Sequence, residues 1–194
     1  MTRAAPDPAR AVRDLLLGLG VDPDADPELR GTPERVARAW RDELLAGYRV
    51  DPAAVLADAL ATEERGMVLV TRVTYASVCP HHLLPSWGVA HVGYLPDGRI
   101  VGLGALVRLV EAFSRRLVLQ EALGRQVAEA LVTHLGARAA GVALDAAHAC
   151  LSTCGERQGG ARVVTHAFAG GWRDDAAGRL EFLRALPASG GGER

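Results

Sequence analysis

The sequence predicts an α+β fold, with helices first and then a sheet that carries further helices. Three observations predict it. Apolar residues recur with helical spacing over the first third of the chain. β-Branched residues then become frequent in a segment that begins at residue 66. From there strands and helices follow in blocks, in the order strands, two helices, two strands and a last helix, which is the α+β pattern.

The N-terminal third is predicted to be helical. Residues 9–20, "ARAVRDLLLGLG", have helical spacing and end on Gly20. A second helix begins at "TPERVARAW", where we expect Thr32 as the N-cap and Pro33 at the first helical position. Residues 52–62 are expected to form a further short helix.

The rest of the chain supplies the predicted sheet. Residues 66–77, "GMVLVTRVTYAS", predict a strand, and residues 87–102 predict a hairpin that turns at Asp97-Gly98. The remaining expected elements are helices at 106–117 and 123–134, strands at 140–153 and 161–170, and a helix at 174–186.

Composition and charge exclude several classes of function. The net charge is -1, with 22 basic against 23 acidic residues, so the chain lacks the basic excess of a nucleic-acid-binding protein. No apolar run is long enough for a transmembrane helix, and the first residues lack the apolar core of a secretory signal. Three cysteines do not make a disulfide framework. We therefore expect a cytoplasmic protein with reduced thiols, and neither nucleic acid nor membrane as a partner.

The first chemistry-bearing window is "SVCPHHLLPSWG", residues 77–88. Cys79 and His82 have the Cys-x-x-His spacing, which lets two side chains reach one ion from a tight turn. On its own, such a pair is more often a buried thiol beside surface imidazoles. The interpretation therefore depends on a second group of ligands elsewhere in the chain.

That second group is "AAHACLSTCG". His148 and Cys150 stand two residues apart in a predicted strand, which would point both side chains to the same face. With the first window, they are enough for a catalytic zinc site of three protein ligands and one open position. A histidine in an Ala-rich strand is also often only a hydrogen-bonded core residue, and spacing does not decide which atoms bind.

With both windows in view, the chain resembles the GTP cyclohydrolase I family. The family's Cys-Glu-His-His motif is matched by residues 79–82, and its His-x-Cys motif by residues 148–150. The family's "GLSKLxRIVExYSRRLQxQE" is matched by "GLGALVRLVEAFSRRLVLQE" at 102–121, and "TPERVARAW" is similar to its Thr-Pro-x-Arg helix. The resemblance runs in order from about residue 10 to residue 186.

The resemblance implies a function for each part of the site. The implied residues are Cys79, His82 and Cys150 as Zn²⁺ ligands, His81 and His148 as acid/base residues, and Gln120, Glu121 and Arg108 as substrate-binding residues. The implied reaction hydrates C8 of GTP, opens the imidazole ring, releases formate and gives a dihydroneopterin-type product. Such an enzyme serves pterin or folate biosynthesis.

The resemblance also implies an architecture. This is the tunnelling fold, an antiparallel four-stranded sheet with two helices on one face, here preceded by N-terminal helices. The expected regions are an N-terminal helical region at 1–65, a tunnelling-fold catalytic domain at 66–187 and a flexible tail at 188–194. Subunits of this family assemble into a homo-oligomer, which we expect to be a decamer with active sites between subunits.

Two departures from the family pattern concern the triphosphate. The family's Ser-Lys pair is Gly104-Ala105 here, and the Arg four residues after the ligand Cys is Cys154. The alternative function is therefore a zinc hydrolase acting on a purine or pterin-like substrate that lacks the triphosphate. Four arginines either compensate for the lost anchors or are solvated surface charges: Arg115, Arg116, Arg157 and Arg162. A third departure, Pro80 in place of Glu, removes a carboxylate.

Further alternatives remain open at this stage. Three roles are open for Cys154: a fourth ligand that closes the zinc site, a reactive thiol, or an inert small replacement for the family's Arg. The protein as a whole is alternatively a non-enzymatic relative with a structural zinc, although such a site needs none of His81, His148 and Glu121. A reductase on a related tunnelling fold would use a nucleophilic cysteine, and the ligand set disfavours that hypothesis.

Overall fold

The computed structural model describes residues 6–187 and divides the chain into two compact units. The first unit ends at Ala46 and the second begins at Gly47. The boundary expected near residue 65 stays a prediction, and the expected tail at 188–194 lies outside the described residues. Among the helices of residues 6–187, none has the length and apolar character needed to cross a membrane.

The first unit is helical, as predicted. Its elements are α1 (Pro8–Gly18), a 3₁₀ turn at Pro27–Leu29, α2 (Thr32–Ala39) and a π-helical turn at Trp40–Leu44. The predicted N-cap of α2 is wrong by one residue, because Gly31 takes this position in a left-handed conformation with φ 74°. The hydroxyl of Thr32 instead accepts a hydrogen bond from Nη2 of Arg35 at 2.8 Å.

The second unit is built on an antiparallel sheet with the strand order β2-β3-β5-β6. The strands are β2 (Val68–Val78), β3 (Pro85–Leu95), β5 (Ala139–His148) and β6 (Val163–Gly170). A register shift between Val70 and Val73 leaves Arg72 at φ 59° on the bulged strand. The expected four-stranded antiparallel sheet is therefore confirmed.

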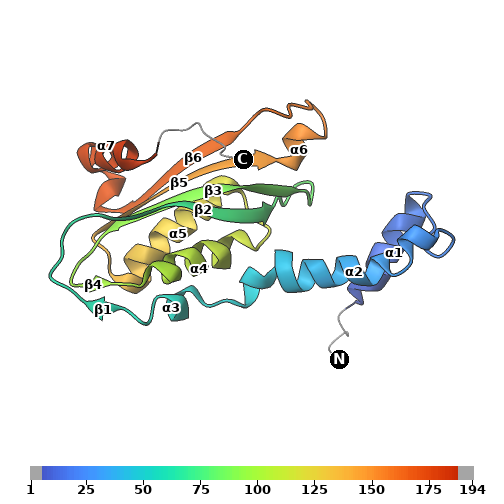
Figure 1. Cartoon of the computed structure of the whole chain (residues 1–194), viewed down its shortest axis with the longest axis horizontal. Helices are drawn as coiled ribbons and strands as arrows, with labels where there is room; N and C mark the ends of the chain where they lie inside the picture. The colour runs from blue at the N-terminus through green and yellow to red at the C-terminus, as the bar shows by residue number, and fades with distance from the viewer. Residues whose placement is uncertain (1–5, 188–194) are drawn as a thin grey trace. The chain divides into compact units, whose positions relative to one another are not determined.

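Two helices cover one face of this sheet, α4 (Leu103–Ser114) and α5 (Gln120–Ala130) (Figure 1). Their apolar faces meet the strands in the main core, where Leu106, Leu123 and Val142 are buried. Burial of each such side chain stabilises the fold by about 1.5–3 kcal/mol relative to exposure. A smaller cluster on the opposite face holds α7 (Ala176–Ala185) through Trp172 and Phe182.

The predicted hairpin at 87–102 is wrong. β3 pairs with β2 and β5, whereas β4 (Arg99–Ile100) pairs with β1 (Leu60–Ala61) in a separate two-stranded sheet. Pro96 follows β3 and lacks the N–H needed to continue a ladder, so the chain leaves the main sheet there. The helix predicted at 52–62 is accordingly shorter, since only α3 (Pro52–Val55) is helical.

The strand predicted at 140–153 also ends early. β5 stops at His148, and Ala149–Ser152 form the one-turn helix α6. Side chains favour this turn, because the hydroxyls of Ser152 and Thr153 donate to the carbonyls four residues before them, at 3.0 and 2.7 Å. The strand geometry predicted for His148 and Cys150 is therefore wrong.

Candidate metal centre

Cys79 and His82 lie on the loop that joins β2 to β3. The loop is closed by two backbone hydrogen bonds: the Cys79 N–H donates to the Leu84 carbonyl at 2.9 Å, and the Leu83 N–H donates to the Cys79 carbonyl at 2.9 Å. Leu83 adopts a left-handed conformation with φ 55°, which allows the chain to reverse. Cys79 and His82 therefore lie on a tight turn, as the Cys-x-x-His spacing predicts.

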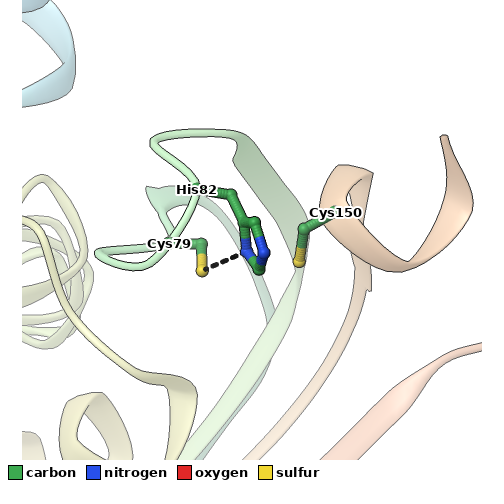
Figure 2. A group of neighbouring side chains, drawn as sticks. All are labelled: Cys79, His82 and Cys150. Atoms are coloured by element: carbon green, nitrogen blue, oxygen red, sulfur yellow. Dashed lines mark hydrogen bonds between the residues drawn. The ribbon is translucent and has the colours of Figure 1, made fainter. Parts of the chain in front are cut away.

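Cys150 reaches this loop from a distant part of the sequence. Ser86, near the start of β3, pairs with His148, the last residue of β5. The end of β5 and the one-turn helix α6 therefore lie beside the β2–β3 loop. Figure 2 shows the Cys79, His82 and Cys150 side chains pointing toward one another. One ligand atom from each lies within 4.8 Å of the other two.

These three residues, the Cys79/His82/Cys150 group, fit a zinc ion. Zinc binds thiolate sulfur at about 2.3 Å and imidazole nitrogen at about 2.0–2.1 Å, so a tetrahedral site places its donors roughly 3.5–3.8 Å apart. The Sγ atom of Cys79 lies 3.8 Å from Nδ1 of His82. Two sulfurs and an imidazole are a donor set that suits zinc, and three protein donors leave one coordination position open.

The electrostatics of the Cys79/His82/Cys150 group favour a cation. Burial raises the pKa of the Cys150 thiol, and the neighbouring Cys79 sulfur raises it further. A divalent ion would relieve the repulsion between two thiolates. Cys154 is not part of the group; it is exposed, and its sulfur lies 3.6 Å from the Thr153 hydroxyl.

His148 lies next to the Cys79/His82/Cys150 group and contacts Gln120 rather than a metal ligand. Its Nε2 atom is 2.8 Å from Oε1 of Gln120. Burial lowers the pKa of the His148 imidazole, and the Glu121 carboxylate offsets part of that shift. The neutral imidazole is therefore favoured. Glu121 itself is exposed, in the first turn of α5.

The side chain of Gln120 is anchored in a way that the sequence did not indicate. Only 6% of the residue is exposed, and its amide nitrogen lies 2.9 Å from the Val163 carbonyl and 3.1 Å from the Thr165 hydroxyl. Both of these partners belong to β6. No local sequence signal links them to Gln120, because the contact depends on how α5 lies on the sheet.

The remaining predicted site residues are exposed. His81 follows Pro80 on the same loop as the metal group, and its ring lies nearly perpendicular to that of His82, with 6.4 Å between the centroids. Arg108 lies on α4. Its Nη1 atom is 3.3 Å from the place where a Cβ atom on Gly104 would stand. The guanidinium therefore folds back along the helix toward its first turn.

Three of the four arginines considered as replacement anchors have partners within the chain. Arg116 donates to the carbonyls of Ala112 at 2.7 Å and Gly47 at 3.0 Å, and its guanidinium lies over two aromatic rings. Arg162 donates to the Asp145 carboxylate at 2.6 Å. Arg115 pairs with Glu111 at 3.6 Å. Arg116 is thus built into the fold.

Fold and site together define a class: a tunnelling-fold protein with a Cys₂His group that suits a catalytic metal. The model of the family GTP cyclohydrolase I matches residues 8–187, and the chain belongs to this family. This confirms the expected fold and the expected enzyme class, a hydrolase of the GTP cyclohydrolase I type.

Two individual sequence relatives show the same relationship. The GTP cyclohydrolase 1 of Mycobacterium ulcerans (strain Agy99) is 45% identical over 186 residues, which cover 94% of this chain and 91% of the relative. The GTP cyclohydrolase 1 of Chromobacterium violaceum is 42% identical over 178 residues, covering 91% and 85%. Among solved structures, the archaeosine synthase QueF-Like in the apo form is 19% identical with a TM-score of 0.47, covering 56% of this chain and 98% of that one.

Proposed function

We propose that this protein is a zinc-dependent cyclohydrolase that hydrates C8 of a guanine nucleotide, with GTP as the first substrate to test. Water adds at C8, the imidazole ring opens, C8 leaves as formate, and the product is of the dihydroneopterin type. The observation that carries the proposal is the convergence of the Cys79, His82 and Cys150 donor atoms within 4.8 Å. Zinc bound there would supply a hydrolytic nucleophile from water at neutral pH.

The other residues of the site have roles that suit this reaction. His148 and His81 are the proposed acid/base residues, and proton transfer by positioned side chains is worth about 100- to 10,000-fold in rate. The Glu121 carboxylate would accept hydrogen bonds from the guanine N–H donors, and Arg108 would bind phosphate. The purine contact expected of Gln120 stays a prediction.

The experiment that tests the proposal uses zinc-loaded protein with GTP and measures formate release together with pterin fluorescence. We expect both products in equal amounts, and both lost when a chelator removes the metal. Absence of formate at every zinc loading, with zinc content verified on the same samples, would contradict the proposal.

One observation favours the second candidate, a purine or pterin-like substrate without the triphosphate. Ala105 is buried in the main core, 5% exposed, and the cysteine at 154 has no cationic side chain, so neither position offers a cation to phosphate. A charge-assisted hydrogen bond is worth roughly 1.5–3 kcal/mol. Without these two cations, the triphosphate of GTP should add much less binding affinity over substrates that lack it. A panel of GTP, GMP and guanosine, compared by kcat/KM for formate release, separates the two candidates.

We also propose a homo-oligomer, with the decamer of the family as the expected form. The strand order leaves β2 and β6 as the edges of the main sheet, and exposed edges are usually covered or paired. Light scattering on the purified protein tests this, and a particle with the mass of one 20.4 kDa chain would contradict it. We propose a cytoplasmic location, because the thiols of the metal group need a reducing compartment.

A further inference from the structure

We propose that Gln120 is a positioning residue that holds the His148 ring in one orientation and one tautomer, with a proton on Nε2. The inference rests on the proposed function, because it takes His148 to be an acid/base residue. It differs from the purine contact expected of Gln120.

The orientation of the Gln120 amide follows from its surroundings. One end of the amide lies 2.9 Å from the Val163 carbonyl and 3.4 Å from the Leu144 carbonyl. A carbonyl oxygen can only accept hydrogen bonds, so the amide NH₂ must be at this end. The Thr165 hydroxyl, 3.1 Å away, accepts as well. The opposite end of the amide, which faces His148, is therefore the oxygen.

The His148 tautomer follows from that orientation. Oε1 of Gln120 has no hydrogen, so the 2.8 Å contact is a hydrogen bond only if His148 donates from Nε2. A proton on Nε2 is required whether the ring is neutral or protonated. Nδ1 is then the ring nitrogen that this hydrogen bond does not engage.

The position of Gln120 makes this hydrogen bond rigid. Gln120 is the first residue of α5, and its amide binds β5 through Leu144 and β6 through Val163 and Thr165. Three elements of the fold thus fix the oxygen that His148 meets. Both amide hydrogens are used within the chain, and the residue is 6% exposed, so little of the amide remains for a substrate.

The test combines a spectroscopic and a kinetic measurement. Nitrogen chemical shifts of ¹⁵N-histidine-labelled, zinc-loaded protein report which ring nitrogen carries the proton. We expect neutral His148 to be protonated on Nε2, and Gln120→Met, which keeps the length but not the acceptor, to lose this preference. Gln120→Met should lower kcat by roughly 10- to 1,000-fold, with KM and zinc content little changed.

A second variant separates positioning from folding. Thr165→Val removes one of three acceptors near the Gln120 NH₂ group and leaves the Val163 and Leu144 carbonyls and the hydrogen bond between Oε1 and His148 in place, so the Nε2 tautomer should be kept. Two results would overturn the proposal: a proton on Nδ1 of neutral His148 in the parent protein, or a raised KM with unchanged kcat in Gln120→Met. The first is read from the parent protein even if Gln120→Met does not fold.

The tautomer measurement is independent of turnover. If the parent protein released no formate from any guanine nucleotide, the proposed function would fail, while the nitrogen shifts would still decide the state of His148. An active parent protein with the proton on Nδ1 would refute the positioning role alone.

Discussion

The Sγ atom of Cys79 lies 3.8 Å from the Nδ1 atom of His82, three residues further along the same loop. That separation suits two donors of one tetrahedral zinc ion. The loop is closed by backbone hydrogen bonds at Cys79, so the two donors are held together by the chain reversal itself. Cys150 completes the Cys79/His82/Cys150 group because β5 ends beside the start of β3.

Replacing either of the two proposed thiol ligands should abolish zinc binding. In Cys79→Ser and Cys150→Ser a hard hydroxyl replaces a thiolate. Loss of an outer partner of a metal ligand alone costs about 10- to 100-fold in affinity, so loss of a ligand should cost more. Zinc content after dialysis measures the effect. Cys154→Ser is the matched control and should keep its zinc; a drop as large as in Cys79→Ser would assign Cys154 to the site.

Gly88→Ala should destabilise the sheet that carries the site. A Cβ atom there would lie 2.0 Å from the Asp145 carbonyl oxygen and 2.6 Å from Cα of Ala146, so β3 and β5 would have to separate. Overpacking of this kind costs about 1–3 kcal/mol or more. Urea denaturation measures it. Gly66→Ala is the control, since a Cβ atom at Gly66 has nothing within 4 Å; equal losses in both variants would refute the prediction.

Arg116→Lys should lower stability rather than substrate affinity. The guanidinium of Arg116 donates to three backbone carbonyls and lies over two aromatic rings, a geometry that an ammonium group does not reproduce. We expect a loss of about 1–3 kcal/mol in unfolding free energy. Arg125→Lys, on the exposed face of α5, is the control, and its pair with Glu129 is worth about 0.3–0.5 kcal/mol. A raised KM for GTP with unchanged stability would instead make Arg116 a phosphate anchor.

Tyr75 should make the fold sensitive to alkaline pH. Burial raises the pKa of its phenol above the ordinary value. Above about pH 10 the tyrosine of the unfolded chain ionises while the folded protein keeps its proton, so the free energy of unfolding falls as pH rises. Tyr75→Phe should weaken this fall, which urea denaturation between pH 8 and about 11 would measure.

The same variant should be harmless at neutral pH. Within residues 6–187, the Tyr75 hydroxyl is buried without a hydrogen-bond partner, so removing it leaves no group unpaired. Tyr94→Phe is the contrast, because the Tyr94 hydroxyl accepts from the Val101 N–H at 3.3 Å and its loss should cost about 1–3 kcal/mol. Equal destabilisation by both variants at neutral pH would contradict this account of Tyr75.

Hydrophobic periodicity and β-branched residues located most of the fold. Periodicity placed α4 and α5 within a few residues, because each helix buries one face against the core, and β-branched residues placed β2. The pairing of β3 was not predicted, because the chain only bends at Asp97-Gly98 and β3 pairs with β2 and the distant β5 instead of with β4. The end of β5 was also mispredicted. The sequence after His148 resembles a strand, but hydrogen bonds from the Ser152 and Thr153 hydroxyls to nearby carbonyls favour a helical turn there.

The site was predictable in its parts but not in its assembly. Spacing identified Cys79 and His82 as a pair on one turn, and resemblance to the family supplied Cys150. That the three meet depends on the register of β3 against β5, which no local pattern encodes. The bond between Gln120 and His148 links residues 28 positions apart and was not foreseen for the same reason.

The most direct test of the account is zinc X-ray absorption of the purified, zinc-loaded protein. The spectrum should show two sulfur atoms at about 2.3 Å and imidazole nitrogen at about 2.0–2.1 Å, with a further light atom completing four-coordination. A first shell without sulfur would contradict the assignment of Cys79, His82 and Cys150 as the ligands of a catalytic zinc ion. So would a first shell with three thiolate sulfurs, because the third could come only from Cys154.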